Sequence, residues 1–352
     1  MKRFVTLGEV LLRFKSPGRE RLLQSGAFEA GFGGAEANVA VSLANLGLPA
    51  AFVSAVPANP LGDAAIAELR RHGVDVGGVI RSGERLGLYF LEAGAGSRPA
   101  RVVYDRAGSA LATISATAFD WDAIFSDAGW LHVTGITPAL GESAAALTLA
   151  ACREAKTRGL TVSCDLNHRR TLWRYGKSAP EVMPAIFALV DIGIGGREDC
   201  QHMLGIGVDD ANGAATPAPG DTLHAHEDAT ALEQLTGEVL RAYPNLRALA
   251  LTLRASTDVD RQVYSACLAR RGEFVVGPRY ELGAIVDPIG AGDAFAAGLI
   301  YGLHRGFDAG ATLAFASAAG ALKHSIPGDF NRVSVAEIEQ LVAGAGFGRV
   351  QR

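Results

Sequence analysis

Strand-like and helix-like segments alternate along most of this 352-residue chain, and that alternation limits the fold more than any other feature. Residues 35–47, AEANVAVSLANLG, place apolar side chains on one helical face and end at a glycine. AAFVSAVP, which begins after two further residues, predicts a strand. Similar pairs of a helix-like and a strand-like segment recur along the chain as far as RALALTL at 247–253. Strands separated by helices of this length pair in parallel through right-handed crossovers. We therefore predict a three-layer α/β/α sandwich with a mainly parallel central sheet.

Two segments break the alternation, residues 9–31 and 84–106, where apolar residues alternate around turn material. They predict antiparallel hairpins. Because an isolated hairpin is marginally stable, we expect the two to pair into a small β-sheet that forms a lid over a single domain, residues 1–352. Residues 207–230 have no periodicity and predict a surface loop, in which His224 and His226 are interpreted as solvated for want of a third metal ligand.

The composition excludes several classes of protein. The net charge is −4 and the basic residues are scattered, so no nucleic-acid surface is expected. The four cysteines form no C-x-x-C pair, which argues against a zinc site or a disulfide framework and favours reduced thiols in a cytoplasmic protein. No run of about 18 apolar residues is present, so no membrane segment is expected.

The stretch IVDPIGAGDAFAAGLIYGL, residues 285–303, passes from a strand-like run to a helix through a turn of small residues. Gly290, Ala291 and Gly292 allow close approach of a ligand to the backbone, and a helix start leaves amide donors free for an anion. Asp293 follows directly. Two interpretations remain open at this point: Asp293 caps the helix, or it accepts the proton of a substrate hydroxyl while the amides hold negative charge.

A second glycine turn, in GFGGAEANVAVSLANLG at 31–47, precedes another alanine-rich helix. The two stretches carry the motifs G-G-x-x-x-N, with Gly33, Gly34 and Asn38, and D-x-x-G-A-G-D-x-F, residues 287–295. On these motifs the chain resembles the ribokinase-like, or PfkB, family of sugar kinases over essentially its whole length. The resemblance implies a ribokinase-like fold with the expected lid, and phosphotransferase activity that uses ATP and Mg²⁺.

Within that family, four stretches resemble the 2-keto-3-deoxygluconate kinases: GLYFLE (87–92), RVVYDRAGSAL (101–111), LHVTGITPAL (131–140) and DLNHRRTLW (165–173). The resemblance implies that Asp293 is the catalytic base and that the turn before it is the anion hole. It also implies a sugar-acid pocket lined by Gly34, Tyr89, Tyr104, Arg106, Ile136, Arg169 and Asp293.

The two arginines suit such a substrate on physical grounds. A 2-keto acid carries a carboxylate that neutral sugars lack, and arginine forks bind carboxylates through charge-assisted hydrogen bonds. Arg106 lies in the expected lid and Arg169 just beyond a core strand, so the two can converge where the lid meets the core. The alternative is that both are solvated surface residues, the usual state of an arginine.

The nucleotide side of the site departs from the family pattern. Thr252 and Arg254 occupy a phosphate-contacting turn that commonly reads T-L-G, so an arginine replaces the glycine. The family's N-x-x-E, associated with magnesium, reads Gly196 to Asp199, which leaves the metal ligands unknown. Lys323 falls in a segment that resembles the one flanking adenine, although it and its neighbour His324 also suit an exposed helix end.

Together these features predict ATP-dependent phosphorylation of 2-keto-3-deoxy-D-gluconate to its 6-phosphate. Two alternatives stay open: a PfkB kinase of another sugar, such as fructose, ribose or 5-keto-2-deoxygluconate, and a sugar-acid sensor that does not phosphorylate. A nicotinamide dehydrogenase is not expected, because VTLGEVLLRF lacks G-x-G-x-x-G. The open face of a lid sheet favours a homodimer or higher homo-oligomer. The sequence does not separate gluconate- from galactonate-derived acids.

Overall fold

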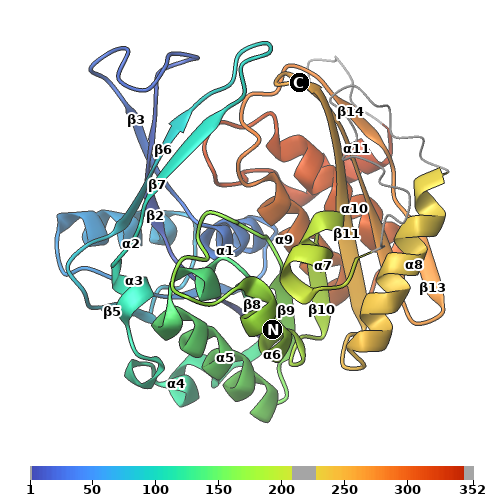
Figure 1. Ribbon diagram of the computed structural model, residues 1–352, viewed down its shortest axis with the longest axis horizontal. Coiled ribbons are helices and arrows are strands. Elements are labelled where there is room, and N and C mark those ends of the chain that lie inside the picture. The colour runs from blue at the N-terminus through green and yellow to red at the C-terminus, as the bar shows by residue number, and fades with distance from the viewer. Residues whose placement is uncertain (1, 208–226, 345–352) are drawn as a thin grey trace.

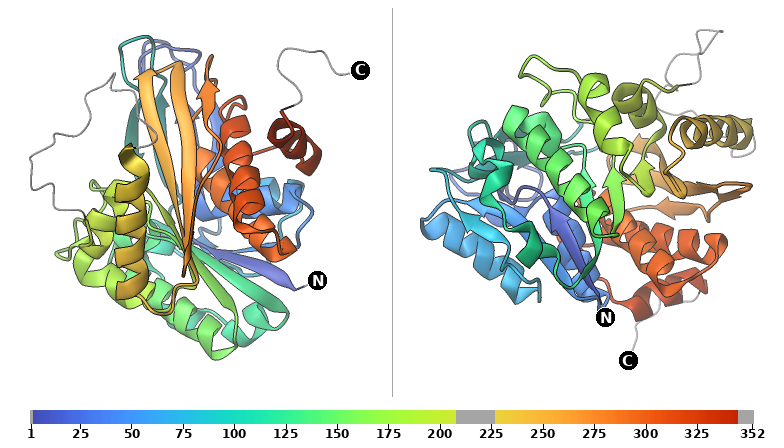
Figure 2. Two further views of the ribbon diagram at one scale, coloured as in Figure 1. Left: turned by 90° about the vertical axis from the view of Figure 1, so that its right-hand side faces the viewer. Right: turned by 90° about the horizontal axis from the view of Figure 1, so that it is seen from below.

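The computed structural model describes residues 2–207 and 227–344. They form three layers, in which one large sheet lies between two layers of helices (Figures 1 and 2). In the described chain the sheet has ten strands, and its order along the main path is β13-β12-β11-β10-β9-β8-β1-β4-β5. Seven neighbouring strands are parallel, as predicted. These strands are β1 (Arg3–Leu7), β4 (Ala50–Val56), β5 (Val79–Arg81), β8 (Ala128–Thr134), β9 (Thr161–Asp165), β10 (Ile192–Gly195) and β11 (Ala248–Asp258).

One edge of the sheet departs from the predicted alternation. β12 (Arg261–Arg270) pairs antiparallel with β11, and β13 (Glu273–Val276) and β14 (Tyr280–Leu282) both pair antiparallel with β12. No helix separates these strands, because short turns connect them and antiparallel neighbours need no crossover. The sheet is therefore mixed at this edge and parallel elsewhere.

Side chains of the strands point alternately into two apolar layers. On β11, Ala248 and Ala250 pack in one layer and Leu249 and Leu251 in the other. The first layer is covered by α1 (Ala35–Asn45), α2 (Pro60–Arg71), α9 (Ala291–Arg305), α10 (Ala309–Lys323) and α11 (Val335–Val342). The second is covered by α3 (Ala110–Thr113), α4 (Trp121–Phe125), α5 (Glu142–Thr157), α6 (Ala179–Phe187), α7 (Arg197–Leu204) and α8 (Glu227–Ala242). Burial on both faces explains the near-continuous apolar runs of the central strands.

A second, four-stranded sheet, here called the small sheet, stands out from this body (Figure 1). Its order is β3-β2-β6-β7, with β2 (Leu11–Lys15) parallel to β6 (Gly87–Glu92) at the centre. The outer strands, β3 (Glu29–Gly33) and β7 (Arg101–Asp105), pair antiparallel. The two predicted hairpins therefore form and join, and β3 runs two residues beyond the predicted boundary.

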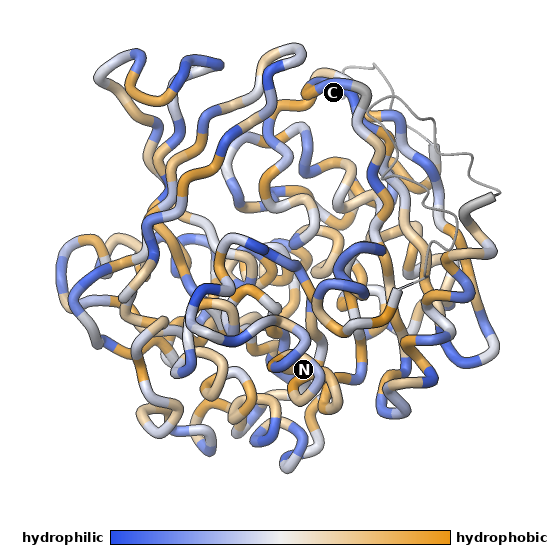
Figure 3. The backbone as a smooth tube through the Cα atoms, in the orientation of Figure 1, coloured by the Kyte–Doolittle hydropathy of each residue, from blue (hydrophilic) through white to orange (hydrophobic). Residues whose placement is uncertain are grey.

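The small sheet contains hydrophobic residues among its polar ones although it stands out from the body (Figure 3). The rings of Phe14 and Phe90 stack with centroids 5.5 Å apart, and Phe28 packs against both edge-on. On the side towards the body, Leu11, Tyr89 and Leu91 form a separate buried cluster. Both faces of the small sheet thus hold apolar surface.

Most of the predicted polar loop, residues 208–226 with His224 and His226, lies outside the described residues, and α8 already begins at Glu227. None of the helices in the described ranges is long and apolar enough to cross a bilayer.

Candidate functional site

A cavity of about 1200 Å³ opens at the carboxyl ends of the parallel strands, between them and the small sheet. This is the edge at which open α/β sheets bind ligands. Residues from distant parts of the chain meet there, and eleven of the predicted site residues are among those that line it. They are Gly34, Tyr89, Tyr104, Arg106, Ile136, Arg169, Thr252, Arg254, Gly290, Gly292 and Asp293.

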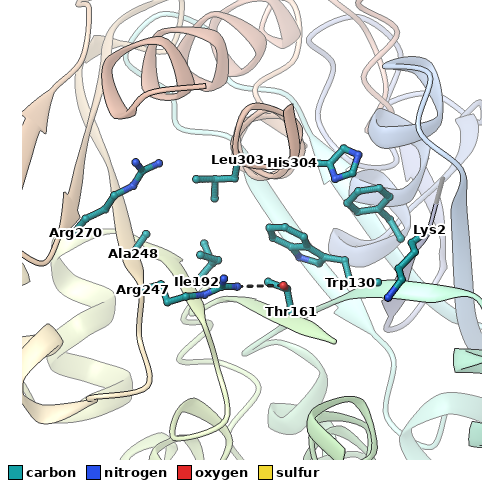
Figure 4. A pocket seen from close by; sticks show the side chains of 11 residues that line it. Lys2, Trp130, Thr161, Ile192, Arg247, Ala248, Arg270, Leu303 and His304 are labelled. Atoms are coloured by element: carbon teal, nitrogen blue, oxygen red, sulfur yellow. Dashed lines mark hydrogen bonds between the residues drawn. The ribbon is translucent and has the colours of Figure 1, made fainter. Parts of the chain in front are cut away.

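A smaller hollow of about 620 Å³ lies at the opposite, amino-terminal edge of the strands (Figure 4). Phe4, Trp130, Ile192 and Ala248 come from the starts of their strands, and Leu303 and His304 from the end of α9. None of the predicted site residues lines this hollow. The large cavity is therefore the candidate site.

The glycine turn forms the start of α9 as predicted. Gly290 precedes the helix with φ 83°, a left-handed conformation, and a Cβ there would lie 2.1 Å from the main-chain oxygen of Asp329. The N–H groups of Ala291 and Ala294 donate to the carbonyls of Pro288 and Gly290. In the described chain this leaves the amides of Gly292 and Asp293 as first-turn donors for a ligand.

Asp293 does not cap the helix, since Gly290 holds the cap position and no side chain bonds there. Instead, Asn38 at the start of α1 donates from Nδ2 to Asp293 Oδ2 at 2.7 Å. Burial raises the pKa of Asp293 to about 7, while the Asn38 hydrogen bond opposes the rise. A carboxyl with a pKa near neutrality suits a general base.

A second carboxyl in the cavity, Asp165 at the end of β9, was not identified from the sequence. Burial raises its pKa to about 7, and the nearby carboxylates of Asp199 and Asp293 add to the rise. Its only local signal was its position at a strand end, next to the predicted Arg169 segment.

The altered N-x-x-E segment gains a structural explanation. Asp199 accepts hydrogen bonds from the main-chain N–H groups of Gly196, at 2.6 Å, and His168, at 3.0 Å. One of its oxygens therefore holds the start of α7, and the other holds the loop after β9. Within the described residues, no three His, Cys, Asp or Glu side chains gather as a metal site. Asp165 and Glu198, which line the cavity, are the carboxylates left for a cation that arrives with its own oxygen ligands.

The loop between β3 and α1 brings Gly34 against the small sheet. Gly34 has φ 152°, and a Cβ there would meet the main-chain oxygen of Glu9 at 2.0 Å. Glu9 in turn accepts hydrogen bonds from Arg106 Nε, at 2.7 Å, and forms an ion pair with Nη2 at 2.5 Å. Arg106 is 7% exposed, so the surface interpretation of this arginine is wrong. Glu9 leaves Nη1 of Arg106 for a ligand.

The other residues predicted to contact the sugar differ in their exposure and in the hydrogen bonds that they already make. Tyr89 is buried and donates from its hydroxyl to Asp329 at 2.5 Å, so it offers the cavity mainly its ring. Tyr104, 37% exposed, packs its ring 6.0 Å from that of Tyr89 and under the Arg106 guanidinium. Arg169 is exposed on the opposite wall and donates to the carbonyl of His168. Ile136, nearly buried, adds an apolar wall.

Of the residues predicted to contact the nucleotide, Arg254 lies against the turn before α9. Its Nη2 is 3.1 Å from where a Cβ of Gly292 would stand. Thr252 donates to the carbonyl of Gly195 at 3.4 Å and lines the cavity beside it. The arginine that replaces the family's glycine therefore brings positive charge to the turn that is predicted to bind an anion.

Lys323 and His324 contradict the exposed-helix-end interpretation, because they are 0% and 3% exposed. Lys323 is not among the cavity-lining residues, and it lies behind the turn, with Cε 3.4 Å from where a Cβ of Gly290 would stand. Ala291, also predicted at the turn, is fully buried. Direct contact of Lys323 with a nucleotide remains a prediction without support from this placement.

A buried ion cluster behind the turn was also missed. Arg13 of β2 donates to Asp287 and to Asp329, each at 2.5 Å, and all three are at most 4% exposed. Asp287 belongs to the recognised motif, but Arg13 and Asp329 are 316 residues apart and carry no local signal. The cluster ties the small sheet to the start of α9.

Comparison with known proteins agrees with this geometry. The model of the pfkB family carbohydrate kinases matches residues 1–221 and 269–331. A 2-dehydro-3-deoxygalactonokinase of Haloferax volcanii is 32% identical over 98% of each chain, and a 2-dehydro-3-deoxygluconokinase of Bacillus subtilis is 29% identical over 95% of this chain and 93% of its own. The solved 2-dehydro-3-deoxygluconokinase of Thermotoga maritima is 41% identical, with a TM-score of 0.89 over 98% of this chain and 100% of that one.

The raised pKa values predict how stability depends on pH. Between about pH 4 and pH 7, Asp165 and Asp293 keep a proton in the folded chain, whereas in the unfolded chain the same carboxyls, with a pKa near 3.8, have lost it. Their contribution to stability is complete below about pH 4 and is lost as pH rises through about 7. Asp165→Asn keeps the hydrogen bond from Asn167 and removes the titration.

Between about pH 5 and pH 8, we expect the free energy of unfolding in urea to fall by about 2 kcal/mol less for Asp165→Asn than for the parent chain. Equal pH slopes for the two proteins would contradict the burial argument.

Gly34 gives a second prediction. Gly34→Ala forces a Cβ into the Glu9 carbonyl and should destabilise the fold by about 2–3 kcal/mol in urea unfolding. Gly31→Ala, in the same loop-strand segment with open space around it, is the matched control and should change stability by less than about 1 kcal/mol. Similar stabilities for the two variants would show that the close contact is relieved at little cost.

Proposed function

Since this chain belongs to the pfkB family of carbohydrate kinases, we propose that it transfers the γ-phosphoryl group of ATP to the terminal hydroxyl of 2-keto-3-deoxy-D-gluconate. One observation carries the proposal: Asp293, at a helix start, lines the same cavity as Arg106 and Arg169. Asp293 is buried, and its pKa is raised to about 7. The products are the 6-phosphate and ADP.

Asp293 is the proposed base. As its carboxylate takes the proton of the terminal hydroxyl, the hydroxyl oxygen bonds to the γ-phosphorus and the bond to the ADP oxygen breaks. Asn38 fixes the orientation of the carboxylate from one side. The amides of Gly292 and Asp293 stabilise the negative charge on the transferred group, because they are already oriented by the helix.

The substrate carboxylate is proposed to lie between Arg106 and Arg169, which line the same cavity from the small sheet and from the loop after β9. Arg106 is held rigidly by Glu9, so it binds without much loss of side-chain freedom. A neutral sugar offers these cations hydroxyl oxygens but no negative charge. This is the feature that favours a sugar acid over fructose or ribose.

The ATP phosphates are proposed to lie along Thr252, Arg254 and the turn before α9. Asp165 and Glu198 are the side chains that we propose would hold Mg²⁺ bound with ATP, where the cation would neutralise part of the phosphate charge. A nearby cation would also favour the ionised form of Asp165, whose pKa is raised by burial and by two other carboxylates.

We propose that the small sheet acts as the lid. Tyr104 and Arg106, at and just past the end of β7, already line the cavity from above, so a ligand would be enclosed between the two sheets. Enclosure excludes water that would otherwise accept the phosphoryl group.

The galactonate-derived epimer is a second candidate substrate, because the relative from Haloferax volcanii is named for it. A coupled ADP-release assay over both keto-deoxy acids, 5-keto-2-deoxygluconate, fructose and ribose tests the proposal. Preference for a keto-deoxy acid supports it. Tight sugar-acid binding without ADP release would instead indicate a sensor.

We further propose a homodimer formed through the small sheet, in a cytoplasmic protein whose four cysteines are free and buried. The support for the dimer is that β7 is an edge strand with Val102, Val103 and Tyr104 each more than a third exposed. Light scattering that returned the mass of one chain would exclude it.

Removing the base gives the first functional prediction. Asp293→Asn should lower kcat by about 10²–10⁴-fold, because the amide cannot accept the proton, while the dissociation constant for the sugar acid changes less than about threefold. Turnover and calorimetric binding measure the two quantities. Near-normal kcat would overturn the assignment of the base.

The arginines give the second. Arg169→Met should raise the KM for the keto-deoxy acid by about 10–100-fold through loss of a charge-assisted hydrogen bond. The neighbouring Arg170 is exposed and does not line the cavity, so Arg170→Met is the matched control and should leave KM unchanged. If Arg169→Met behaved like its control, the sugar-acid assignment would fail.

A further inference from the structure

Lys323, the last residue of α10, is a charged side chain with no exposed surface. Lysines are among the residues least often fully buried, because taking an ammonium group out of water costs several kcal/mol unless partners replace the water. A buried lysine therefore needs an explanation from its surroundings.

The ammonium group is held by main-chain oxygens. Lys323 Nζ donates to the carbonyl of Ile326 at 3.0 Å and to that of Asp287 at 3.3 Å. The nearby carboxylates of Asp287 and Asp329 accept instead from Arg13. In the described part of the chain, the hydrogen bonds of the amine thus go to uncharged groups.

The position of this charge relates it to the candidate site. A short segment from Asp287 to Gly290 leads into α9, and Lys323 contacts both ends of it. Its Nζ donates to the Asp287 carbonyl, and its Cε lies 3.4 Å from where a Cβ of Gly290 would stand. The same helix start carries the free amides of Gly292 and Asp293. Arg254 approaches Gly292 from the side of the cavity. The anion-binding turn therefore has Arg254 in front of it and Lys323 behind it, next to the cluster of Arg13, Asp287 and Asp329.

We propose that Lys323 is a positioning residue that holds this turn from behind and supplies a positive charge for binding the transferred phosphoryl group. It does not touch the ligand; it acts through the Asp287 carbonyl and the backbone at Gly290. The role rests on the proposed phosphoryl transfer. Burial lowers the pKa of Lys323, but the carboxylates of Asp287, Asp329 and Asp293 oppose that effect and favour the charged form.

Two variants separate charge from packing. Lys323→Met fills the space of the side chain but removes the charge, and Lys323→Gln keeps a donor for the carbonyls without the charge. Both should weaken binding of the ATP analogue AMP-PNP and lower kcat, each by about tenfold or more, because a unit charge in a poorly screened site acts strongly over short distances. The KM for the sugar acid should stay within about threefold. Lys177→Met, at an exposed lysine, is the control.

Chemical rescue provides the decisive readout. Ammonium chloride should restore analogue binding to a third variant, Lys323→Ala, in which the shortened side chain leaves space for a free ammonium ion at the two carbonyls. Tetramethylammonium chloride at equal ionic strength should not restore it. The parent chain should respond equally to both salts. Circular dichroism and thermal unfolding establish that each variant is folded.

The proposal is overturned if either folded variant binds AMP-PNP as the parent chain does, or if both salts restore binding equally. Should Lys323→Met not fold, AMP-PNP binding by Lys323→Gln is compared with that of the parent chain instead. The nucleotide measurements need no sugar, so they separate this role from the substrate assignment. Normal analogue binding by the parent chain with no ADP release from any sugar would refute the proposed function alone.

Discussion

The buried arginine at position 13 holds together the parts on which the site depends. Arg13 comes from the small sheet, Asp287 from the turn before α9, and Asp329 from the loop after α10, and the three meet away from water. Tyr89 adds a hydrogen bond from the small sheet to Asp329. Loss of one member would leave a buried charge unpaired, which typically costs about 3–5 kcal/mol. The geometry of the turn before α9, the proposed anion site, is therefore coupled to the placement of the small sheet.

Much of the fold follows from local patterns. The alternation of strands and helices predicted the parallel sheet, and two interruptions of it predicted the small sheet. The antiparallel edge formed by β12, β13 and β14 was not predicted, because its short strands lack the intervening helices on which the reasoning depended. Propensity describes neighbours in sequence, and the pairing of an edge is decided by tertiary packing.

The position of residues in the candidate site could be predicted where sequence motifs mark them, but not where it depends on electrostatic contacts between residues distant in sequence. The glycine turns, Asp293 and the arginines were identified from their sequence contexts, and the cavity brings them together. Arg13, Asp165 and Asp329 were missed because their roles arise only from burial and from partners distant in sequence. The same reason explains the error at Lys323 and His324: a polar helix end looks exposed unless the loop that covers it is known.

The central claim is that Asp293 faces the terminal hydroxyl of a sugar acid whose carboxylate lies between Arg106 and Arg169. The most direct measurement is a crystal structure with 2-keto-3-deoxygluconate and AMP-PNP. The account predicts the terminal hydroxyl within about 3 Å of the Asp293 carboxylate, with the substrate carboxylate in contact with both arginines. A sugar bound in the reverse direction, with its carboxylate beside Asp293, or bound outside this cavity, would contradict it.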